Sequence, residues 1–232
     1  MNETWEGFVK ALELILSGDP KVYEVTLRSI WISGMATLVA ALWGIPLAVF
    51  LGTRNFRGKF LLKQVVNALL GIPTVALGLI FFLALSRSGP VGFLGLLYTP
   101  TGIIIGEAVL IMPIIVSLST AAIEAVDPEI RNLARTLGAS ESQAAYAVLK
   151  EALSGIFLAG IASFNRAIAE LGIAWMVGGG IFGWTEVLTT GIALNIARGN
   201  IEMGIALGVI LLAVVFVTTI AVNGLQRRRK RV

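Results

Sequence analysis

The chain has 232 residues, of which 56% are hydrophobic and 14% are charged, with a net charge of +4 at pH 7. In soluble domains about a quarter of the residues are charged, so this composition is typical of a protein embedded in a lipid bilayer. The absence of Cys and His excludes disulfides and argues against haem and zinc sites. No glycine-rich nucleotide loop is present either. We therefore expect no catalytic site, cofactor or metal in this chain.

Residues 1–20 are predicted to form an amphipathic helix that lies along the membrane surface. Trp5, Phe8, Leu12 and Leu16 recur at helical spacing with charged residues between them, and the pattern stops before Pro20. The acidic first residues do not resemble a secretory signal, so we expect no cleavage.

Five apolar stretches follow, each long enough to cross about 30 Å of hydrocarbon. They cover residues 25–51, 61–85, 102–123, 153–177 and 204–225. The sequence thus predicts an all-α, polytopic fold with a five-span transmembrane domain over residues 21–225 and a basic tail over 226–232.

The distribution of basic residues predicts the orientation. Twelve Lys and Arg residues lie after the first, third and fifth spans, against five on the opposite side. The positive-inside rule then places the protein in the cell membrane with its N-terminus outside and its C-terminus in the cytoplasm. The basic tail is interpreted as a stop-transfer signal and lipid anchor rather than as a nucleic-acid site, and no nucleic-acid partner is expected.

The first span carries a row of small residues that predicts close helix packing. The row recurs at every fourth position and consists of Ala36, Ala40, Gly44, Ala48 and Gly52. Prolines also fall within the first three spans, at Pro46, Pro73 and Pro113. Each is either a static kink or a flexible point for a conformational change.

The longest cytoplasmic connection, residues 124–151, has the composition of ordered helices. Asp127 and Pro128 are predicted to start one helix, and Gly138 to end it. Ser140 and Gln143 form a capping box that predicts a second helix. The resulting helical hairpin presents a partly apolar surface, which indicates a docking site.

The spans contain a group of charged residues, Glu107, Arg166 and Glu170. Arg166 and Glu170 are four residues apart on one helix face, and Glu107 has a similar predicted depth in the third span. Three interpretations stay open: an ion-pair lock between helices or across a dimer, a passage in which Arg166 attracts an anion, or a proton relay with Glu107 or Glu170.

The cytoplasmic hairpin resembles the EAA loop of ABC importer permeases, the coupling helix that inserts into a cleft of the ATP-binding subunit. The resemblance lies mainly at Ala134, Leu137, Gly138 and Ala139, while Asn132-Leu133 replace the usual Glu-Ala. The alternative is a hairpin without a partner. The residues that the resemblance assigns to ATPase coupling are Asn132, Leu133, Ala134, Arg135, Thr136, Leu137, Gly138, Ala139 and Ser140.

Four other segments resemble the oxyanion branch of these permeases, which transports molybdate, tungstate or sulfate. They are residues 71–75, 86–92, 164–172 and 176–181. Residues 183–194 look most like the tungstate permeases. The resemblance implies the type I importer permease fold. The glycine-rich segment 178–183 is expected to be either a flexible turn or a loop that contacts the binding protein or closes the outer gate.

The resemblance also implies the partners and the mechanism. The chain is expected to form a homodimer in membrane lipid, to engage two ATP-binding subunits that use ATP and Mg²⁺, and to receive tungstate or molybdate from an external oxyanion-binding protein. The runner-up is an ion-coupled secondary transporter or anion channel that uses the intramembrane Glu and Arg residues. A membrane-embedded enzyme has little support, because no nucleophile accompanies the carboxylates.

Overall fold

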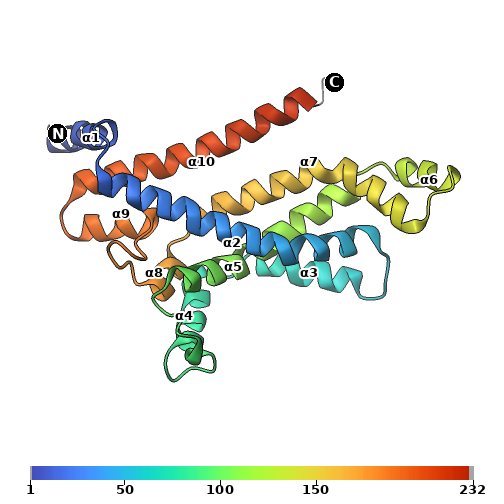
Figure 1. Ribbon diagram of the computed structural model, residues 1–232, viewed down its shortest axis with the longest axis horizontal. Helices are drawn as coiled ribbons and strands as arrows, with labels where there is room; N and C mark the ends of the chain where they lie inside the picture. The colour runs from blue at the N-terminus through green and yellow to red at the C-terminus, as the bar shows by residue number, and fades with distance from the viewer. Residues whose placement is uncertain (1, 230–232) are drawn as a thin grey trace.

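The computed structural model describes residues 2–229, and these residues are mostly helical with no β-strand among them (Figure 1). The tail predicted over residues 226–232 continues the last helix to Arg229, and residues 230–232 lie outside the described part. In chain order the elements are α1 (Asn2–Leu16), α2 (Pro20–Thr53), α3 (Lys59–Leu69), α4 (Thr74–Leu85), the short 3₁₀ helix η1 (Gly92–Leu94), α5 (Pro100–Glu124), α6 (Pro128–Thr136), α7 (Glu141–Ile168), α8 (Gly172–Gly178), α9 (Leu188–Ala197) and α10 (Ile201–Arg229).

Four helices, α2, α5, α7 and α10, are long and apolar enough to cross a membrane. The helices α2, α5 and α10 contain the first, third and fifth predicted spans, and α7 contains the first part of the fourth. The 25 residues of α5 extend for about 37 Å at 1.5 Å per residue, which exceeds the thickness of the hydrocarbon. The long helices run between two ends of the molecule, with α1 and α9 at one end and α6 at the other (Figure 1).

The second predicted span is not one continuous helix. It is divided into α3 and α4, whose axes differ by 93°, and α4 projects from the side of the long helices (Figure 1). Pro73 lies at the break, because proline lacks an N–H group and its ring disfavours helical geometry in the preceding residue. The described residues therefore provide four candidate spans, or five if the bent pair counts as one, and Pro73 lies between two helices rather than within one.

The boundaries of α7 also differ from the prediction. No helix breaker separates Ser140 from the fourth span, so the second helix of the hairpin and the span are one helix of 28 residues. This helix ends at Ile168, well before the predicted boundary at residue 177. The carboxylate of Glu170 accepts a hydrogen bond from the backbone N–H of Ile173 at 3.2 Å, and this contact leads into the separate helix α8.

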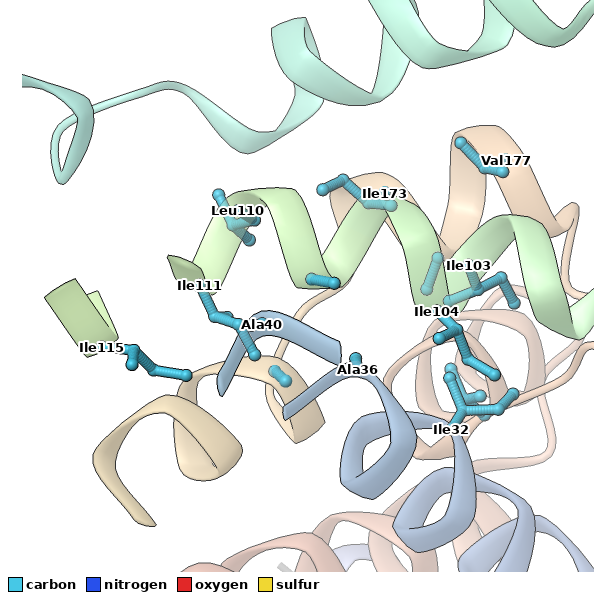
Figure 2. Packing of buried hydrophobic residues seen from close by; sticks show 14 of the residues in the cluster. Ile32, Ala36, Ala40, Ile103, Ile104, Leu110, Ile111, Ile115, Ile173 and Val177 are labelled. Atoms are coloured by element: carbon cyan, nitrogen blue, oxygen red, sulfur yellow. The ribbon is translucent and has the colours of Figure 1, made fainter. Parts of the chain in front are cut away.

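The core lies where α2 crosses α5, and the row of small residues in α2 faces this contact as predicted. A Cβ atom added at Gly44 would lie 3.0 Å from Ile115 Cγ2, and one added at Gly52 would lie 2.6 Å from Ile123 Cγ2. Figure 2 shows Ile32, Ala36 and Ala40 of α2 beside the isoleucines of α5. Small side chains on one helix thus let the branched side chains of the other approach its backbone.

The end of the molecule that holds α1 contains ordered short elements. The predicted N-terminal helix packs along α10, and Lys10 forms an ion pair with Glu202 at 3.3 Å. The glycine-rich segment 178–183 is a turn held by Thr185, whose hydroxyl donates to the Gly178 carbonyl at 2.6 Å and accepts from the Ile181 N–H at 2.9 Å. Helix α9, which follows, was missing from the prediction.

Candidate functional site

The predicted hairpin at the other end of the molecule is present with the expected caps. Asp127 caps α6, Gly138 has a positive φ of 87°, and Ser140 with Gln143 forms the capping box of α7. Only glycine adopts such a φ at little cost. Residues 132–136 lie in α6, and residues 137–140 form the elbow between the two helices.

The elbow exposes apolar side chains while ion pairs hold its shape. Leu133 and Leu137 are 61% and 79% exposed, and no residue of α6 is buried. Arg131 and Arg135 both form ion pairs with Glu141 at the start of α7. Hydrogen bonds from Arg135 and Arg131 hold the pKa of the Glu141 carboxyl below its usual value. An exposed apolar surface on a braced helix indicates docking to a partner.

A second site lies where α7 ends and α8 begins. Arg166 Nη1 donates to Glu170 Oε2 at 2.6 Å, and the two side chains differ in exposure: 38% for Arg166 against 2% for Glu170. Glu170 is also held by the Ile173 N–H and by Thr189, whose hydroxyl donates to the Glu170 carbonyl at 2.7 Å. The buried carboxylate is thus fixed in place, and the guanidinium extends from it towards open space.

Arg166 lines a cavity of about 570 Å³. The start of α4 forms one wall through Thr74 and Val75, and the start of α8 forms the opposite wall. The two walls touch at Gly172, where an added Cβ atom would lie 2.9 Å from Thr74 Oγ1. The cavity is large enough for a small ligand, and Arg166 is the cationic residue among those that line it.

Glu107, the third predicted member of the charged group, is buried in α5 with 1% exposure. It accepts a hydrogen bond from Ser33 of α2 at 3.3 Å, and the charges of Glu170 and Arg166 act on it. Among these three charged residues, the described structure shows a direct hydrogen bond only between Arg166 and Glu170. The structure therefore brings the three residues into one region without linking them in a single network.

Several polar residues near this site were missed or only partly noticed. Glu186 is 2% exposed, and its Oε2 atom has no hydrogen-bond partner among the described residues. Asn165 connects α7 to α10 by donating to Thr219 at 2.9 Å and accepting from Thr218 at 2.8 Å. An isolated carboxylate between apolar stretches was the available signal for Glu186, and nothing in the sequence paired Asn165 with the threonines of the last helix.

Comparisons with known proteins agree on one class. Residues 44–231 match the model of the family described as "Binding-protein-dependent transport system inner membrane component". The chain is 40% identical to the tungstate uptake system permease protein TupB of Peptoclostridium acidaminophilum, over 95% of this chain and 97% of the relative. It is 39% identical to a probable anion ABC transporter permease protein of Haloferax volcanii, over 88% of each chain.

The fold is also found in a solved structure. A chain of the MetNI methionine ABC transporter, in an inward-facing conformation, superimposes with a TM-score of 0.74 at 19% identity. The match covers 90% of this chain and 98% of the other. At this identity the likeness concerns the fold alone.

Proposed function

We infer that this chain, which belongs to the family of binding-protein-dependent transport system inner membrane components, is the permease subunit of an ABC importer that carries tungstate or molybdate into the cell. The family match extends over most of the chain, and the relatives are permease subunits of ABC transporters rather than enzymes. The protein is therefore an integral membrane permease. Members of this class work with ATP-binding subunits and a substrate-binding protein.

The substrate proposal is carried by one observation: the match to a tungstate uptake permease runs through nearly the whole length of both chains. The chemistry of the open pocket beside Arg166 is compatible with it. Tungstate and molybdate are tetrahedral oxyanions, and a guanidinium donates to such oxygens in a planar fork geometry. Arg166 offers its exposed N–H groups to the cavity while Glu170 orients it from behind.

We assign ATPase coupling to α6 and the elbow that follows it. Leu133 and Leu137 form the apolar contact with a cleft of the ATP-binding subunit, and the ion pairs to Glu141 transmit movement of α6 directly to α7. Because α7 is continuous from the elbow to Arg166, movement of the elbow reaches the pocket beside Arg166 through one helix. ATP and Mg²⁺ are bound by the partner subunit.

The assembly follows from the size of the chain and its charge distribution. A symmetric dimer supplies the second wall of the passage, two ATP-binding subunits engage the two elbows, and the oxyanion-binding protein docks at the opposite end. The excess of basic residues at the α6 end supports an orientation with this end in the cytoplasm and the N-terminus outside. Helix α1 then lies at the outer membrane surface, where its exposed Leu12 and Leu16 meet lipid.

The test is the ATPase activity of the chain reconstituted with its ATP-binding subunit, with and without tungstate-loaded binding protein. We expect stimulation by the loaded binding protein, and its loss in Gly138→Pro, because proline does not adopt the φ of 87° at this position. Gly58→Pro is the matched control, since Gly58 has a φ of 93° and open space around it but lies outside the elbow.

The alternative, an ion-coupled secondary transporter, gives a different result in the same system. If no ATP-binding subunit associates and labelled tungstate still crosses proteoliposomes that contain this chain alone, the importer proposal is wrong. If stimulation survives in Gly138→Pro and is lost in Gly58→Pro, the importer proposal stands and the assignment of the coupling segment is wrong.

A further inference from the structure

The end of the molecule that holds α6 carries a second hollow, unrelated to the pocket beside Arg166. It is a groove of about 960 Å³ between the last turns of α2, the start of α7 and α6. Pro46 and Phe50 of α2 and Tyr146 of α7 line its apolar part. Phe50 and Tyr146 are 47% and 68% exposed, so this apolar surface is not covered by the chain itself.

The polar part of the groove contains two arginines. The side chain of Arg54 is exposed and has no hydrogen bond or ion pair in the described part of the chain. Arg131 donates to the Thr53 carbonyl at 3.1 Å and to Glu141 at 3.0 Å, yet its buried Nε atom has no hydrogen-bond partner among the described residues. Glu141 also lines the groove, and its carboxylate forms a second ion pair with Arg135, which lies outside the groove. The two arginines and one carboxylate that line the groove leave a positive balance.

We propose that this groove binds one anionic phospholipid, with the phosphate between Arg54 and Arg131 and an acyl chain along Pro46, Phe50 and Tyr146. The inference rests on the orientation given under the proposed function, which puts the groove at the cytoplasmic leaflet. Anionic lipids are present in this leaflet, and basic pockets between spans bind their headgroups. The apolar part lies on the helices that cross the membrane, and the arginines lie just beyond the apolar end of α2.

A phospholipid fits these observations better than a free oxyanion or a protein segment does. A tetrahedral oxyanion would occupy only the polar part of a groove of about 960 Å³ and would leave the apolar part empty. A segment of the ATP-binding subunit approaches from the cytoplasm, whereas Pro46 and Phe50 lie within the hydrophobic part of α2. An amphiphile with an anionic head satisfies both parts at once.

The position of the lipid gives it a consequence for coupling. Its phosphate would join Arg54, at the end of α2, to Arg131 on α6, and α6 is the segment assigned to ATPase coupling. A bound anionic lipid thus holds α6 against the membrane-spanning helices, in addition to the existing bond from Arg131 to Thr53.

The test uses the full-length chain purified in detergent and titrated with short-chain phosphatidylglycerol while its thermal unfolding midpoint is followed. Phosphatidylcholine of the same chain length and inorganic phosphate serve as the other ligands. We expect saturable stabilisation by phosphatidylglycerol, and binding weaker by roughly five- to tenfold in Arg54→Gln. Arg57→Gln is the matched control, because this substitution removes the same charge from the connection after α2, and Arg57 does not line the groove. The Arg54 side chain has no partner among the described residues, so the variant should fold.

Four results overturn the proposal. Equal stabilisation by phosphatidylcholine shows that the phosphate charge is not recognised, and equal loss in Arg57→Gln shows diffuse attraction to a basic loop. Equal stabilisation by inorganic phosphate assigns the site to a free oxyanion. Loss of the lipid effect when the ATP-binding subunit is assembled assigns the groove to that protein. The titration needs neither ATP nor transport, so its failure is distinguishable from failure of the importer proposal.

Discussion

The Arg166–Glu170 pair gives the sharpest test of the interior site, because its two members differ so much in exposure. Replacing Arg166 with Met leaves the Glu170 carboxylate, which is 2% exposed, with only its bond from the Ile173 N–H. Leaving a charge buried without its partner costs about 3 kcal/mol or more. Glu170→Gln instead leaves Arg166, which is 38% exposed and reaches water in the cavity, so we expect a loss of about 1 kcal/mol.

The expected asymmetry is therefore about 2 kcal/mol in the free energy of unfolding, measured by denaturation of the purified chain in mixed micelles. The double variant Arg166→Met/Glu170→Gln removes both charges and should recover most of the stability lost in Arg166→Met. Tungstate uptake by the reconstituted importer should stay low in both variants that lack Arg166, and should persist in Glu170→Gln.

Uptake in the double variant separates two of the interpretations that the sequence left open. If uptake returns along with stability, the pair is only a lock between helices and the passage role of Arg166 is refuted. Equal destabilisation by the two single variants would refute the argument from burial. A third interpretation, the proton relay, requires uptake to fail in Glu170→Gln while stability is retained.

Three further outcomes are expected. Gly52→Ala should destabilise the protein by about 1–3 kcal/mol in thermal unfolding, since the new Cβ would lie 2.6 Å from Ile123 Cγ2. The control Gly34→Ala, whose new Cβ would have no atom within 4 Å, should be neutral or stabilising. Equal effects of the two substitutions would disprove the packing argument. Ser140→Ala should weaken the start of α7 by about 1 kcal/mol and raise hydrogen exchange at Gln143, and unchanged exchange would contradict the capping box. The bonds from Arg135 and Arg131 lower the pKa of Glu141, so the link between α6 and α7 should be fully present above the unfolded-state pKa of about 4.3 and be lost as pH falls through the lower folded pKa. The loss should appear as faster hydrogen exchange in α6, and Glu141→Gln should show this faster exchange at every pH. A pH-independent exchange rate in the unchanged protein would refute the argument.

Much of the secondary structure of this protein follows from local sequence signals. Apolar runs of sufficient length predict the helices that cross the membrane, because burial in lipid depends on composition rather than on neighbours. The caps at Asp127 and Ser140 and the turn at Gly138 were predictable for the same reason, since each rests on contacts within a few residues. The small-residue row of α2 predicted a close contact, although it did not identify α5 as the partner.

The candidate site was only partly predictable. The four-residue spacing of Arg166 and Glu170 predicts their pairing, because i and i+4 lie on one helix face. Their unequal burial, the cavity beside Arg166 and the bond from Ser33 to Glu107 join segments that are far apart in the chain. No local pattern contains such contacts, and the position of Glu186 between apolar stretches was the only local sign of its burial.

The sequence by itself determined which segments are apolar, where helices start and which residues carry charge, because these depend on side-chain chemistry and short-range backbone geometry. Only the tertiary structure decided that the second span bends by 93° at Pro73 and that α7 ends before Glu170. Proline permits a break without setting its angle. The bent arrangement brings the first turn of α4 against the first turn of α8 at Gly172, a contact between residues about a hundred positions apart.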